Sequence, residues 1–80
     1  MGVTEDLADA LARDVLEAVD KTGDDTLIEA VAKTLGTSSS VTQDAFMTSI
    51  RVRTAEARAR KLLNERLKKA LADRKAAGSQ

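Results

Sequence analysis

Residues 49–75, SIRVRTAEARARKLLNERLKKALADRK, decide the fold of this chain, because they contain neither Gly nor Pro and carry ten of its 13 Lys and Arg residues. The chain has no Pro at all, and no Gly lies between Gly36 and Gly78. The pattern therefore predicts one uninterrupted helix over residues 41–77, about 55 Å long at ~1.5 Å per residue. Ser40 and Gln43 match a capping box, so we expect them to begin this helix.

A first, shorter helix is predicted over residues 5–22. Apolar residues such as Leu11 and Val15 recur at helical spacing, and acidic residues occupy the other side. Thr4 is the expected N-cap, and Gly23 is expected to close the C-terminus. The result is an amphipathic helix with an acidic outer surface.

A second helix is predicted over residues 26–35. Thr26 and Glu29 match a capping box, and Gly36 is expected to end the helix. The polar stretch at 36–40, GTSSS, is then a loop. At about ten residues, this helix needs tertiary packing to persist.

The composition favours an all-α fold, since the 80 residues include no Pro, four Gly and one aromatic residue. We expect one helical domain over residues 1–77, with two short helices packed on the first half of a long C-terminal helix. Residues 78–80 are expected to form a disordered tail. The expected core consists of Leu11, Val15, Val19, Ile28, Val31, Leu35, Phe46 and Ile50.

Several kinds of chemistry are disfavoured by the residue types. The chain has no Cys and no His, which removes disulfides, the usual zinc and transition-metal ligands, imidazole bases and thiolate nucleophiles. No calcium-binding loop or glycine-rich phosphate loop matches its pattern. We therefore expect a non-enzymatic protein with no catalytic residues, no metal, no cofactor and no small-molecule substrate.

Charge divides the chain into two halves. Residues 1–45 carry ten acidic and three basic residues, a net charge of −7, and residues 46–80 carry ten basic and three acidic residues, a net charge of +7. The simplest partner for the basic half is the acidic half, in the same chain or in a second copy. Pairs within the long helix, Glu56 with Arg60 and Glu65 with Lys69, are expected as well.

The long helix is predicted to associate with itself, because two short helices cover only about half of its length. Apolar residues continue in one stripe along the second half, and we expect a homodimer to bury them. The small Ala residues favour a close-packed antiparallel pair over a regular coiled coil, although the sequence leaves the orientation open. The predicted self-association residues are Val52, Ala55, Ala59, Leu62, Leu63, Leu67 and Ala70.

Nucleic acid is the alternative partner. Segment 27–46 resembles a helix-turn-helix, with a Gly and a Ser-rich turn before a new helix, but only Gln43 lies where a base-reading side chain is expected. Non-specific phosphate contacts along one basic face are the more plausible route. That face consists of Arg51, Arg58, Lys61, Lys68, Lys69 and Lys75.

An anionic membrane is the weakest of the three partners considered, because the apolar side of the basic helix is rich in Ala and lacks bulky anchors. No signal peptide and no run of about 20 apolar residues occurs in the sequence. We therefore expect a cytoplasmic protein that does not bind membranes and whose protein partner is most simply a second copy of itself.

Overall fold

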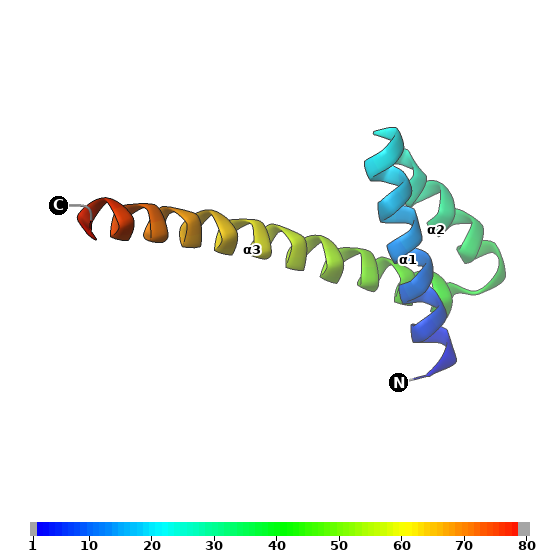
Figure 1. The fold of residues 1–80 in the computed structure, drawn as a ribbon. Coiled ribbons are helices and arrows are strands. Elements are labelled where there is room, and N and C mark those ends of the chain that lie inside the picture. Colours follow the sequence, from blue (N-terminus) through cyan, green and yellow to red (C-terminus); the bar gives the residue numbers. More distant parts are fainter. Residues whose placement is uncertain (1, 79–80) are drawn as a thin grey trace.

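The computed structural model describes residues 2–78, which form three helices: α1 (Val3–Thr22), α2 (Thr26–Ser38) and α3 (Ser40–Gly78) (Figure 1). No strand occurs within this range, so the predicted all-α class is confirmed. Gly78, expected in a disordered tail, is the last residue of α3, and residues 79–80 of that tail lie outside the described residues.

Helix α3 runs through 39 residues without interruption and has two different surroundings. We call residues 3–54 the head, in which α1 and α2 lie against the first part of α3, and residues 55–78 the arm (Figure 1). Every residue of the arm is exposed. The molecule is therefore elongated, with extents of 64 × 30 × 13 Å. Its radius of gyration is 18.2 Å, against about 12 Å for a compact chain of this length.

The core lies where α1 and α2 cross the first turns of α3. Phe46 is completely buried there, in contact with a cluster that also includes Val15 and Ile50. These three belong to the predicted core, and its other five members, Leu11, Val19, Ile28, Val31 and Leu35, are half-buried at the margin of the same cluster. The core is small, because only six residues of the described range are buried.

Three of these six buried residues are alanines that the predicted core omits. Ala8 and Ala12 of α1 are 1% and 0% exposed, and Ala32 of α2 is also buried. Their small side chains let the helix backbones approach one another, and Phe46 fills the space between them. The least exposed residues of the core are therefore Ala8, Ala12 and Phe46.

The C-terminus of α1 lies where the sequence predicts it, but its N-terminus does not. Gly23 adopts the left-handed conformation with φ 73°, and its N–H donates to the Val19 carbonyl at 2.7 Å, as expected of a helix-ending glycine. At the other end the helix begins two residues early, with Gly2 instead of Thr4 at the N-cap. The Glu5 carboxylate accepts a hydrogen bond from the Gly2 N–H at 3.0 Å, which supports these two extra residues.

The N-cap of α2 is Asp25, whose side chain makes no capping hydrogen bond, and the residue before it holds the first turn. The Asp24 carboxylate accepts hydrogen bonds from both the backbone N–H and the hydroxyl of Thr26. Thr26 is therefore the first residue of the helix and not its N-cap, so the predicted box with Glu29 is wrong.

The end of α2 lies three residues beyond the predicted one. Gly36 stays inside the helix, and the Ser39 N–H donates to the Leu35 carbonyl at 2.8 Å to close it. A Cβ atom at Gly36 would lie 2.7 Å from Nε2 of Gln43, so this glycine permits a close approach of α2 to α3. The predicted loop at 36–40 is reduced to Ser39 alone.

The N-cap of α3 is Ser39, one residue before the predicted Ser40. Its Oγ accepts hydrogen bonds from the Thr42 N–H at 3.1 Å and from the Thr42 hydroxyl at 2.9 Å. Ser39 has the extended backbone typical of an N-cap, with φ −158° and ψ 110°. Gln43 does not turn back to cap the helix, because its Nε2 donates to the Ala32 carbonyl of α2 at 2.9 Å.

Candidate functional site

Helix α3 exposes an apolar stripe along one side, which begins at Val52 in the last part of the head and continues through the arm. All seven predicted self-association residues, Val52, Ala55, Ala59, Leu62, Leu63, Leu67 and Ala70, are exposed, and the four large ones are 53–62% exposed. Leu71 is exposed to a similar extent and was not predicted, although it lies one turn after Leu67. We define the stripe as these eight residues, the seven predicted ones and Leu71. No other described residue covers it.

Helical geometry sets the width of this stripe. At about 100° per residue, Val52, Ala59, Leu63 and Ala70 fall within an arc of about 40°. Ala55 and Leu67 lie about 60° to either side of its centre. Leu62 and Leu71 lie further out, about 80° and 100° from the centre on opposite sides. The stripe thus consists of a central seam of four residues with two apolar residues on each side, and it spans about half of the helix circumference.

The stripe continues past the head with partial cover, because Ala45, about 20° from the centre of the seam, is half-buried against the core. Phe46 and Ile50 turn toward α1 and α2, and at about 100° per residue they point roughly 120–160° away from the seam. Val41, in the first turn of α3, is 67% exposed, and Val52 is exposed too. The head therefore occupies mainly the opposite side of α3, and along the head the seam is exposed at Val41 and Val52 but partly covered at Ala45.

The predicted basic face lies on the arm's other side. Its six members, Arg51, Arg58, Lys61, Lys68, Lys69 and Lys75, are all exposed. They span an arc of about 120° centred nearly opposite the seam. Within residues 2–78 none of the six takes part in an ion pair. The arm is thus amphipathic, with an apolar side and a positively charged side.

One ion pair joins the acidic and basic halves at the base of the arm. Nε and Nη2 of Arg53 each donate to a different carboxylate oxygen of Asp9 at 2.7 Å. These hydrogen bonds hold the pKa of Asp9 below its ordinary value and raise the pKa of Arg53. Within the described residues it is the only ion pair between helices, since the other two join residues four apart in one helix.

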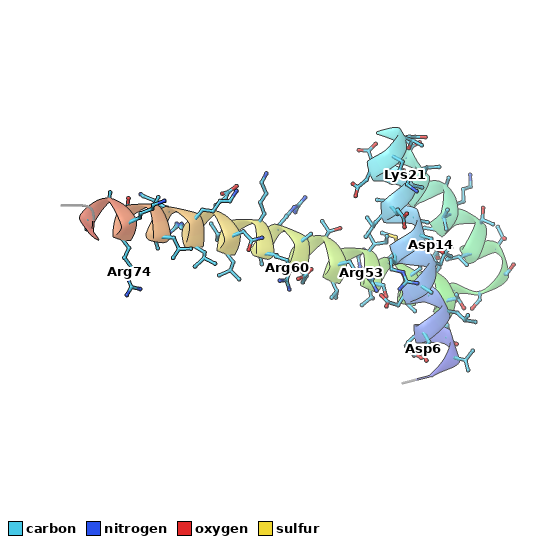
Figure 2. The ribbon with its side chains drawn as sticks, viewed as in Figure 1. Asp6, Asp14, Lys21, Arg53, Arg60 and Arg74 are labelled. Carbon is cyan, nitrogen blue, oxygen red and sulfur yellow. The ribbon has the colours of Figure 1, made fainter. Side chains whose placement is uncertain are left out.

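Beyond that point no ion pair of the described residues joins the arm to α1 or α2. Figure 2 shows Arg53 beside α1, whereas Arg60 and Arg74 extend from the arm with no other helix beside them. Arg60 pairs with Glu56 at 2.6 Å, as predicted, but no ion pair joins Glu65 and Lys69 in the described part of the chain. Most of the basic half is therefore left for an external partner or for solvent.

The segment that resembles a helix-turn-helix differs from that motif in the structure. A single residue, Ser39, separates α2 from α3, because α2 continues through Gly36. Gln43, the candidate base-reading side chain, is half-buried and bonded to the Ala32 carbonyl. Segment 27–46 thus has neither the expected turn nor a free polar side chain at the expected place.

Comparison with protein families, curated proteins and solved structures finds no match.

The remaining features of the head are small. A hollow of about 340 Å³ between α1 and the base of the arm is open to solvent; it is lined by Leu16, Asp20, Arg53, Thr54, Ala57, Arg58 and Lys61.

No group of three carboxylates in the described range is placed to hold a metal ion. Likewise, none of the helices found between residues 2 and 78 is long and apolar enough to cross a bilayer.

Proposed function

We propose that this protein is a non-enzymatic assembly module that self-associates as a homodimer through the apolar stripe of its arm. One observation carries the proposal. Large aliphatic side chains of the stripe are more than half exposed, and most of them lie on the arm, where every residue is exposed.

The energetics of the arm support this function. Burial of apolar surface is worth roughly 25 cal/mol per Å², or about 1.5–3 kcal/mol for a complete large side chain. Val52, Leu62, Leu63, Leu67 and Leu71 together offer several such side chains, enough to offset a substantial part of the cost of association. An isolated helix is also marginal in water, so a partner would stabilise the arm itself.

Mass measurement by light scattering tests the proposal. Leu63→Asp with Leu67→Asp places two charges in the stripe, where burial without a partner is costly, and we expect a dimeric mass to become monomeric. Asn64→Asp with Ala72→Asp is the matched control, because it adds the same two charges outside the seam. A wild-type chain that is monomeric at high concentration, or a mass unaffected by the seam substitutions, would contradict the proposal.

A second candidate function is non-specific binding of nucleic acid. The observation in its favour is that six exposed bases share the side of the arm opposite the stripe, so that a dimer would leave them outward. Phosphate contacts would give an affinity that falls linearly with salt on logarithmic axes.

Titration of generic duplex DNA at several salt concentrations tests this candidate. Lys68→Gln with Lys69→Gln should weaken binding and reduce the salt slope by about one for each lost phosphate contact. Lys21→Gln with Lys33→Gln, on the head, is the control with the same change in charge. The absence of binding at low salt would remove this candidate and leave self-association untouched.

A further inference from the structure

The order of large and small residues along six positions of the stripe is symmetric about Lys61, and this order determines how two copies would pack together. Large and small side chains are arranged as mirror positions around Lys61: Val52 with Ala70, Ala55 with Leu67, and Ala59 with Leu63. Each pair is equidistant from Lys61 in the sequence, and each joins one large residue to one alanine. All six are exposed on the same uninterrupted helix.

We propose that a second copy of the chain covers the arm in antiparallel orientation, with the two helices crossing at the level of Lys61. This inference rests on the proposed self-association and adds its orientation and register. In this register Val52, Leu63 and Leu67 of one copy each lie level with an alanine of the other, whereas Leu62 and Leu71, at the edges of the stripe, lie level with Arg60 and Arg51. The layers between the helices then have nearly equal volume, as close packing requires.

A parallel pair in register would be packed unevenly. Leu63 would meet Leu63 and Leu67 would meet Leu67, whereas Ala55 and Ala59 would each meet their own copy. Layers that are alternately crowded and empty prevent one constant distance between the helix axes. The order of residue sizes in the stripe therefore favours the antiparallel arrangement.

The charges beside the seam follow the same symmetry. Glu56 and Arg66 are also equidistant from Lys61, and each lies about 40° from the centre of the seam, on opposite sides. The antiparallel pair places the acid of one copy level with the base of the other, whereas a parallel pair would set Arg66 against Arg66. Arg60 bonds to Oε1 of Glu56, which leaves Oε2 for a second base.

The opposite net charges of the two halves of the chain also favour the antiparallel orientation, through electrostatic interactions over a longer range. Two parallel arms would align their net positive charges along the whole contact. In the antiparallel register Ala77 of one copy lies level with Ala45 of the other, which brings the basic end of each arm beside an acidic head. Lys61 itself belongs to the basic face, so the two lysines at the crossing point away from each other.

Engineered cysteines give a direct test, because the chain has no cysteine of its own. Val52→Cys and Ala70→Cys are made as separate variants, one carrying an affinity tag, and are mixed and oxidised. Level residues in facing seams lie within disulfide range, and the mixed product should exceed the two self-linked products together by about tenfold. In a parallel pair the two positions would be about 27 Å apart along the axis and only self-linked products would form.

Register is checked with Ala77→Cys, which shares the seam but lies seven residues from Ala70, about 10 Å along the helix. Equal or preferred linkage of Val52→Cys to this variant, or a dimer without the Val52–Ala70 product, overturns the register. If a dimeric sample gives only self-linked products, the two arms are parallel. The proposed antiparallel orientation is then wrong, but self-association stands. A monomeric mass by light scattering before oxidation overturns self-association itself, so that the failures are distinguishable. All three positions are exposed, so the core of the head is unchanged in every variant.

Discussion

The Arg53 guanidinium binds the Asp9 carboxylate through two parallel hydrogen bonds of 2.7 Å, which tie α1 to α3 just before the exposed arm begins. Beyond Thr54 every described residue is exposed. The pair therefore lies beside the boundary between the packed part of α3 and the exposed arm. Its bidentate geometry is the strongest form that an Arg–carboxylate contact takes.

The stability of the head should depend on pH through Asp9. The pKa of Asp9 is lowered in the folded state, mainly by the hydrogen bonds from Arg53, below its ordinary value of 3.8. The pair's contribution is thus fully present above pH 3.8 and is lost as the pH falls through the folded-state pKa. In urea unfolding at pH 7 and pH 3, Asp9→Asn should destabilise the chain at pH 7 and have a smaller effect at pH 3.

Asp6→Asn provides the control for this prediction, since it makes the same change on the exposed side of α1 (Figure 2). An effect of Asp9→Asn that is the same at both pH values would show that the ionised carboxylate is not what stabilises the contact.

Phe46→Ala should remove most of the stability of the head. Phe46 is completely buried at the crossing of the three helices, and truncation of a core Phe costs about 3–5 kcal/mol. A chain of this length has a total of only about 4–12 kcal/mol. Thermal unfolding followed by circular dichroism should show a greatly lowered midpoint, whereas Val3→Ala, at a residue 74% exposed, should change stability by less than about 0.5 kcal/mol. Similar effects of the two substitutions would contradict the packing described for α3.

Gly36 and Gln43 should be energetically coupled. An alanine at Gly36 gains about 1 kcal/mol of helix propensity. Its Cβ would displace the Gln43 side chain from the Ala32 carbonyl, at a cost of about 1 kcal/mol for the lost hydrogen bond. Gly36→Ala should thus be nearly neutral in the wild type and stabilising by about 1 kcal/mol in a Gln43→Ala background.

Urea unfolding of the four members of this double-mutant cycle measures the coupling. If Gly36→Ala has the same effect in both backgrounds, the two residues do not compete for the same space.

Ser39 and Ser40 should differ sharply although they are adjacent. Ser39 caps α3 through its bond to the Thr42 N–H, and replacement of a capping serine by alanine costs about 1 kcal/mol. Ser40 is exposed within the first turn, so Ser40→Ala should change stability by less than about 0.5 kcal/mol. Urea unfolding of the two variants decides which serine is the cap, and a larger loss for Ser40→Ala would restore the register expected from the sequence.

Features that depend on local sequence were predictable. The long helix follows from the absence of Gly and Pro between Gly36 and Gly78, and the end of α1 follows from the need for a left-handed residue at Gly23. The exposed stripe was found for a related reason, because helical spacing places its residues on one side whatever surrounds them.

Features that depend on contacts between helices were not predictable. Gly36 has the signature of a helix end, but its role is set by Gln43 in another helix. Ala8 and Ala12 are the most buried residues of α1, yet a pattern that weighs residues by size selects Leu11 and Val19 instead. Burial of an alanine is decided by how closely two backbones approach, which is a property of the assembled head.

The extents of 64 × 30 × 13 Å also govern how the molecule moves through water. A rod-like particle meets more friction than a sphere of equal mass, so a single chain of 8.5 kDa would diffuse and tumble as though it were considerably heavier. Pairing arm against arm adds mass across the thin dimension more than along the long one. The frictional ratio from sedimentation velocity should therefore fall as the mass doubles, which separates a pair of chains from one merely extended chain.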